Sequence, residues 1–91
     1  MKSKLEELFD DENFGVEAVG HNNGIMIYKS SVPVDFLILE YKNRFDVYLN
    51  LFDEGEPPYR NILVKGSSKK LETAQKIAVR KLEKEINTRV R

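Results

Sequence analysis

The sequence predicts an α+β fold, an antiparallel sheet of four to five strands with a short N-terminal helix and a long C-terminal helix packed on one face. Three observations lead to this prediction. Segments with apolar residues at every second position fill the middle of the chain, as expected for strands. Clusters of Gly, Asn, Asp, Ser and Pro separate these segments. Residues 66–91 instead repeat apolar residues at spacings of three and four, which predicts an amphipathic helix.

Length and composition fit one small globular domain covering residues 1–91. Apolar residues make up 41% of the chain and charged residues 33%, which is typical of globular domains. There is no Cys, which excludes a disulfide scaffold and a thiolate metal site. The longest apolar run, Phe36 to Leu39, is too short to span a membrane, and the N-terminus lacks the apolar core of a signal peptide. We therefore expect a cytoplasmic protein without membrane association.

The chain begins with a short helix predicted over residues 3–11. Leu5, Leu8 and Phe9 recur at helical spacing, and Ser3 is a suitable N-cap. Strands are predicted after it, the first two joined by a turn at residues 20–24, where Gly and Asn tolerate positive φ. The segment 34–41 is apolar on both faces and is expected to be a central strand. The five predicted strands are 14–19, 25–29, 34–41, 45–52 and 59–65.

The C-terminal helix is predicted to start at Gly66-Ser67-Ser68-Lys69-Lys70, with Ser67 or Ser68 as its N-cap. One side carries its apolar residues, and two alanines there permit close packing on the sheet. The opposite side is basic. The apolar residues are Leu71, Ala74, Ala78, Leu82, Ile86 and Val90, and the basic ones are Lys69, Lys76, Arg80, Lys84 and Arg91.

The basic residues of this helix run against its local stability. Lys76, Arg80 and Lys84 repeat at i, i+4, where like charges oppose helix formation. Lys69 and Lys70 fall in the predicted first turn, where the macrodipole disfavours each cation by about 0.3–1 kcal/mol. A helix start with free N–H groups, hydroxyls and two Lys suits a phosphate. The alternative interpretation is a solvated face that only keeps the domain soluble.

Charge is unevenly distributed although the net charge is zero. Residues 1–59 contain five basic and twelve acidic residues, whereas residues 60–91 contain ten basic and three acidic residues. This asymmetry favours a basic binding surface, an acidic one, or both, and it is also compatible with self-association.

Catalytic groups are scarce. His21 is the single histidine, and it lies in the predicted Gly/Asn turn without an acidic neighbour in sequence. The carboxylates Asp53, Glu54 and Glu56 fall in a predicted loop that would not fix their geometry. We therefore expect no catalytic residues, no cofactor and no metal site.

Four tyrosines, Tyr28, Tyr41, Tyr48 and Tyr59, lie in or beside the predicted strands. On an open sheet face they could stack nucleic-acid bases. Cross-strand packing, or burial against the first helix or a second subunit, is the alternative use.

The segment Gly66-Ser67-Ser68-Lys69-Lys70, followed by Ala74 and Ala78, resembles the third RNA-contact region of double-stranded-RNA-binding domains. The resemblance implies an α-β-β-β-α fold in which the Lys pair contacts phosphates across the major groove. It also implies minor-groove contacts from Gly20 and His21 and from the first helix, which carries Glu6 and Glu7. The chain departs from the pattern in its extra predicted strands and in Leu71, which stands where that family usually has Ala.

The first functional expectation is a non-enzymatic nucleic-acid-binding domain. Its predicted contacts are Lys69, Lys70, Lys76, Arg80 and Lys84, with His21 as a further groove contact. The alternative is a small protein-interaction module, such as a phage-type regulator or inhibitor of a larger machine, which would use the acidic loop 53–56 or the basic helix. A homodimer through a Tyr-bearing sheet face is a third option.

Overall fold

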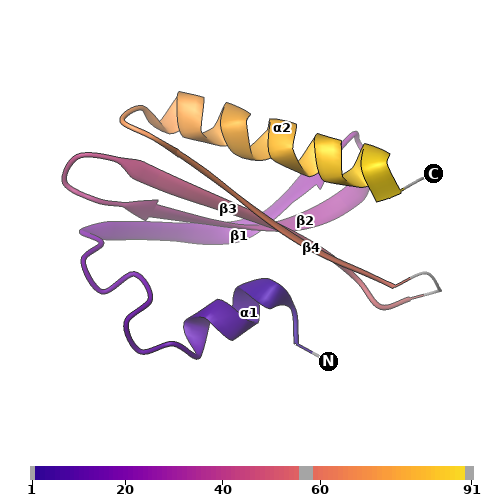
Figure 1. Cartoon of the computed structure of the whole chain (residues 1–91), viewed down its shortest axis with the longest axis horizontal. Helices are drawn as coiled ribbons and strands as arrows, with labels where there is room; N and C mark the ends of the chain where they lie inside the picture. Colours follow the sequence, from indigo (N-terminus) through magenta and orange to yellow (C-terminus); the bar gives the residue numbers. More distant parts are fainter. Residues whose placement is uncertain (1, 56–58, 90–91) are drawn as a thin grey trace.

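The computed structural model of the chain describes residues 2–55 and 59–89, which form two helices and four strands (Figure 1). Parts of the predicted features, namely Glu56 in the acidic loop and Val90 and Arg91 at the end of the helix, lie outside the described residues. The elements are α1 (Lys4–Phe9), β1 (Gly20–Tyr28), β2 (Val32–Glu40), β3 (Phe45–Asp53), β4 (Arg60–Ser68) and α2 (Leu71–Arg89).

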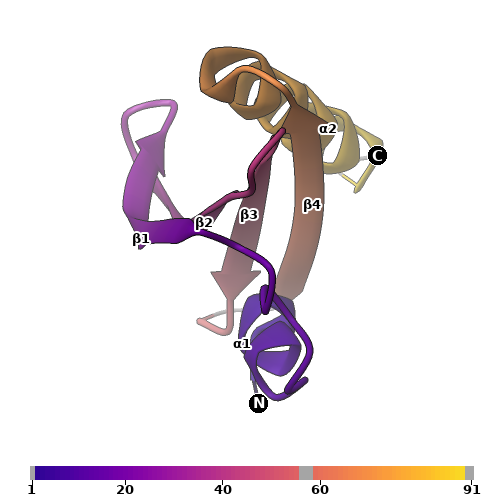
Figure 2. The ribbon, with the colours of Figure 1, turned by 90° about the vertical axis from the view of Figure 1, so that its left-hand side faces the viewer.

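The four strands form one antiparallel sheet in the order β1-β2-β3-β4. Each strand therefore pairs with its neighbour in sequence, and β1 and β4 are the edges. The two helices cover opposite sides of this sheet, as Figures 1 and 2 show. We call these sides the α1 face and the α2 face. The predicted α+β class, with a short N-terminal and a long C-terminal helix, is confirmed.

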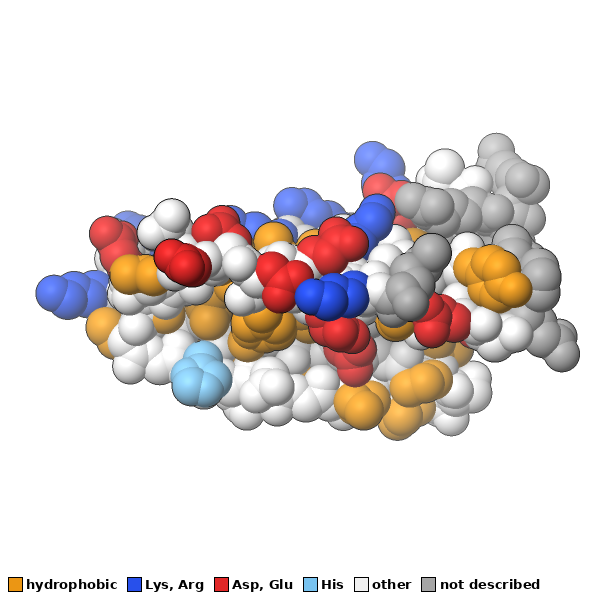
Figure 3. Space-filling view, turned by 90° about the horizontal axis from the view of Figure 1, so that it is seen from below, with side chains coloured by type: hydrophobic (Ala, Val, Ile, Leu, Met, Phe, Trp, Pro, Cys, Tyr) orange, Lys and Arg blue, Asp and Glu red, His pale blue; other side chains and the backbone are white. Residues whose placement is uncertain are grey.

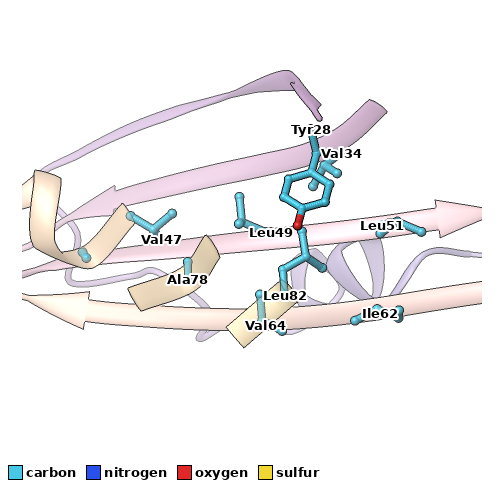
Figure 4. Packing of buried hydrophobic residues seen from close by; sticks show 10 residues of the cluster. Tyr28, Val34, Val47, Leu49, Leu51, Ile62, Val64, Ala78 and Leu82 are labelled. Atoms are coloured by element: carbon cyan, nitrogen blue, oxygen red, sulfur yellow. The ribbon is translucent and has the colours of Figure 1, made fainter. Parts of the chain in front are cut away.

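The core on the α2 face forms where α2 packs against β3 and β4 (Figure 4). Ala74, Ala78 and Leu82 of α2 are completely buried, as their helical spacing predicts. The helix can come this close because Gly66 of β4 has no side chain. A Cβ atom built at Gly66 would lie 2.3 Å from the carbonyl oxygen of Ala74 and 2.6 Å from the backbone nitrogen of Ala78.

The core on the α1 face is smaller, and polar side chains fix α1 to it. Leu5 of α1 packs with Leu37, Leu39 and Tyr48 of the sheet. The oxygen of Ser3 accepts a hydrogen bond from the backbone N–H of Glu6, so the predicted N-cap is confirmed. Two further N–H groups of the first turn are satisfied by sheet side chains: Lys4 donates to Asn61 Oδ1 and Leu5 donates to Asn50 Oδ1.

The start of the sheet differs from the prediction. Residues 14–17 form turns and residues 18–19 are irregular, so no strand forms over 14–19. The predicted turn 20–24 lies inside β1, and the sheet has four strands rather than five. The chain reverses instead at Lys29 and Ser30, which both have positive φ, as the central residues of a type I′ turn do. The chain reverses there because this position allows a longer pairing between β1 and β2. With the reversal there, nine consecutive residues of β1 pair with β2, from Gly20 with Glu40 to Tyr28 with Val32.

The junction between β4 and α2 also differs. β4 continues to Ser68, so the predicted helix start from Gly66 to Lys70 contains the end of a strand and a short connection. The Ser67 hydroxyl donates to Asp46 and is not an N-cap. The prediction failed because Val47 and Asp46 of β3 supply backbone partners for Gly66 and Ser67, and this pairing overrides the local preference of Ser for a helix start.

The tyrosines do not share an open face. Tyr28 is buried in the core of the α2 face, whereas Tyr48 is buried in the core of the α1 face. Tyr41 lies after β2, where the Arg44 guanidinium is 4.2 Å from its ring centroid, and Tyr59 is exposed before β4. The predicted Tyr-bearing surface for base stacking or dimerisation is therefore wrong, and burial in a core is the use found for Tyr28 and Tyr48.

Candidate nucleic-acid interface

The outward side of α2 carries a row of three cations. Because Ala74, Ala78 and Leu82 hold the opposite side against the sheet, Lys76, Arg80 and Lys84 must point to solvent, and all three are exposed. Among residues 2–55 and 59–89, none of these three makes an ion pair. The row therefore keeps its charge available for a ligand.

Lys69 and Lys70 lie in the connection just before α2 and add two cations next to this row in the chain. Both are exposed and belong to the connection after β4, which corrects their predicted place in the first helical turn. The carbonyl of Lys70 accepts a hydrogen bond from Ala74, and its N–H donates to Ser68 Oγ. The connection is thus tied to both elements. We call the exposed residues Lys69, Lys70, Lys76, Arg80 and Lys84 the basic face.

Acidic residues are present beside the basic face but are outnumbered. Residues 69–88 contain six basic and three acidic residues, the acids being Glu72, Glu83 and Glu85. Near its C-terminal end the surface is hollowed where Arg80, Glu83 and Lys84 meet Asn87 and Thr88. Lys81, which is not among the predicted contacts, borders the basic face, and its Nζ donates to the carbonyl of Lys65 at 2.8 Å.

His21 does not join the basic face. It is exposed on β1 opposite Leu39, a residue of the α1-face core, so its side chain lies on the other side of the sheet from α2. There it borders a hollow with Phe9 and Phe14. The expected turn at His21 is wrong, because β1 includes it. His21 and the basic face are therefore on opposite sides of the sheet.

Lys65 is likewise separate from the basic face, because its charge is paired on the α1 face. Its Nζ lies 3.5 Å from Asp46, whose side chain is nearly inaccessible to solvent. Asp46 also accepts hydrogen bonds from Ser67 at 2.7 Å and from Arg44 at 3.1 Å. Burial alone would raise the pKa of Asp46, but these hydrogen bonds and the Lys65 charge outweigh it and hold the pKa below its usual value.

The Asp46 cluster predicts a pH-dependent contribution to stability. Asp46→Asn is expected to lower the free energy of unfolding by about 1–3 kcal/mol at pH 7, because it weakens charge-assisted hydrogen bonds at a buried site. Since the folded pKa lies below the unfolded value of about 3.9, this contribution is complete above that value and is lost as pH falls through the folded pKa.

Urea unfolding of wild type and Asp46→Asn at pH 7 and at about pH 3 measures this contribution. The difference in stability should shrink at the lower pH. The control, Asp10→Asn, removes only an exposed ion pair with Lys2 and should change little at either pH. A difference between wild type and Asp46→Asn that does not depend on pH would contradict the assignment.

The α1 side of the molecule is acidic. Residues 1–19 contain six acidic and two basic residues, and Asp and Glu side chains gather on this face in Figure 3. The acidic loop is partly engaged, since Asp53 lies 3.5 Å from Arg60. The predicted asymmetry of charge along the sequence thus becomes an asymmetry in space, with α2 on the basic side.

The described residues contain no group of three His, Cys, Asp or Glu side chains placed to hold a metal ion. Within the same residues, neither helix is both long enough and apolar enough to cross a membrane. No protein-family model, curated protein or solved structure matches this chain significantly. The assignment of function therefore depends on the chemistry of the surfaces described above.

Proposed function

We propose that this domain binds nucleic acid without catalysing a reaction, through phosphate contacts from the basic face. The observation that carries the proposal is the row Lys76, Arg80 and Lys84, exposed and without an ion pair among the described residues. Like charges at this spacing weaken a helix, so folding alone does not favour them. A bound polyanion attracts all three cations and so offsets their mutual repulsion.

The spacing of the row suits a phosphate backbone. Residues four apart on a helix are separated by about 6 Å along its axis, so the three cations span roughly 12 Å. One strand of a duplex presents a phosphate about every 3.4 Å along its axis, so the row extends over about three or four phosphates. Lys69 and Lys70 add two cations next to the row in the chain, and their resemblance to the Lys pair of double-stranded-RNA-binding domains makes duplex RNA the first ligand to test.

The proposal predicts electrostatic binding that weakens steeply with salt. Fluorescence anisotropy with labelled duplex RNA, duplex DNA and single strands should detect binding at low salt, with affinity falling linearly against salt on logarithmic axes. If none of the three ligands binds at low salt, the proposal is wrong. The ligand with the highest affinity at near-physiological salt identifies the preferred class.

A variant with Lys76, Arg80 and Lys84 all changed to Gln tests the surface itself. Loss of three phosphate contacts should reduce the salt slope by about 3 and lower affinity at least tenfold at low salt. The matched control changes the exposed Lys4, Lys29 and Lys42 to Gln, which alters net charge equally but at residues outside the basic face. Equal loss in both variants would show that only overall charge matters and would contradict a site on α2.

A protein-interaction module is a second candidate, and the acidic α1 side favours it. Phe9, Val16 and Val19 are exposed apolar residues in the acidic segment 1–19, a combination suited to a basic protein partner. A phage-type regulator or inhibitor of a larger machine fits this description. A pull-down with and without nuclease separates the candidates, because partners that survive nuclease treatment favour this second one.

A further inference from the structure

The outer edge of β1 is unprotected. β1 pairs with β2 along all nine residues, and its other edge makes no hydrogen bond to any further segment among residues 2–55 and 59–89. Natural edge strands are usually protected by charged residues, Pro, bulges or short length. Residues 20–28 contain no charged residue and no Pro, and their register with β2 is uninterrupted.

The opposite edge of the sheet is protected in the usual ways. β4 carries the charged residues Arg60 and Lys65, and the Lys81 side chain donates to the Lys65 carbonyl. The difference between the two edges shows that protection is specifically lacking at β1. A strand that is long, neutral and free along one side is suited to pairing with another strand.

β1 also exposes two large apolar side chains. Ile25 and Ile27 are 65% and 59% accessible, and both point to the α1 face because their partners in β2, Asp35 and Pro33, are on that face. On the α2 face the neighbouring residues Met26 and Phe36 line an apolar groove beside α2, which packs mainly over β3 and β4. The edge therefore offers both backbone groups and apolar surface.

We propose that β1 pairs antiparallel with β1 of a second copy of this chain, giving a continuous eight-stranded sheet. A two-fold axis near Ile25 places Ile25 opposite its own counterpart, with Ile27 diagonal to it, so the exposed isoleucines bury one another. The strand opposes itself without like-charge repulsion, because residues 20–28 are uncharged. The zero net charge of the chain removes long-range repulsion between copies.

This pairing has a geometric consequence. The two-fold axis of antiparallel strands is perpendicular to the sheet, so both α2 helices lie on one side and both α1 helices on the other. The dimer is independent of the proposed function. If nucleic acid binds to the basic face, the dimer presents two such faces in the same direction.

Sedimentation velocity over a range of concentrations tests the dimer with the full chain. Wild type should sediment increasingly as a dimer as concentration rises, whereas Ile25→Lys should remain monomeric because it opposes two cations across the axis. The control Val16→Lys introduces the same change at a residue that is 68% accessible and outside β1, and it should dimerise like wild type. Circular dichroism should show that all three chains are folded.

Hydrogen exchange locates the contact independently of the variants. Amides of residues 20–28 should gain protection as wild-type concentration rises, while other strands change little. The proposal is overturned if wild type stays monomeric up to about 1 mM. It is equally overturned if Ile25→Lys dimerises like wild type, if Val16→Lys is as monomeric as Ile25→Lys, or if protection at residues 20–28 does not depend on concentration.

Discussion

Replacing Gly66 with alanine is expected to lower the free energy of unfolding by about 3 kcal/mol, an unusually large effect for one added methyl group. The new Cβ would lie 2.3 Å from the Ala74 carbonyl oxygen and 2.6 Å from the Ala78 nitrogen. These are backbone atoms of α2, so no side chain can rotate to make room. The helix must move away from β4, which loosens the packing of Ala74, Ala78 and Leu82.

Thermal or urea unfolding measures this effect, with an expected fall in Tm of about 12–24 °C for a domain of this size. The matched control is Gly20→Ala, also in a strand, where the nearest atoms to a new Cβ are 3.7 Å away. That variant should be neutral or slightly stabilising. Similar stabilities for Gly66→Ala and wild type would show that α2 does not pack on β4 at this distance.

Asn50→Ala is expected to lower the free energy of unfolding by about 3 kcal/mol and to release α1. Asn50 is completely buried, and its Oδ1 accepts from Leu5 N–H at 2.9 Å. Its Nδ2 donates to Asn61 Oδ1 at 3.1 Å and to the Ile62 carbonyl at 3.0 Å. Removing the amide leaves donor and acceptor groups without partners in a buried site, and it also leaves a cavity.

Urea unfolding measures the loss of stability, and hydrogen exchange of residues 4–9 measures the release of α1. Asn22→Ala, a change at an exposed position of β1, provides the control and should leave both measurements near wild type. Asn50→Asp sharpens the result. The Asp side chain retains an acceptor for the Leu5 N–H, but it has no donor for Asn61 Oδ1 and the Ile62 carbonyl oxygen. This variant should therefore be as destabilising as Asn50→Ala. Protection of α1 that is unchanged in Asn50→Ala would contradict the proposed attachment.

Periodicity predicted the parts of the fold in which each pattern had one interpretation. The spacing of Ala74, Ala78 and Leu82 fits only a helix with one buried side, and the alternation in 45–52 fits only a strand. Both predictions are confirmed, as is the cap at Ser3. The exposure of Lys76, Arg80 and Lys84 follows from the same helical period, so the candidate site was largely predictable.

The remaining features depend on contacts between residues that are distant in sequence. Local residues favour a turn at 20–24, yet nine-residue pairing with β2 makes this segment a strand and moves His21 to the α1 face. The attachment of α1 depends on Asn50, whose partner Leu5 is 45 residues away. Likewise, the unprotected edge of β1 becomes visible only once the strand order is known.

Chemical-shift mapping by NMR is the decisive test of whether the basic face binds nucleic acid. Titration of the isotope-labelled chain with duplex RNA and duplex DNA at low salt should shift signals of residues 69–84 and reverse those shifts when salt is added. Signals of the acidic segment 4–19 should not shift. Shifts confined to the α1 side, or no shifts at low salt with either ligand, would contradict the claim.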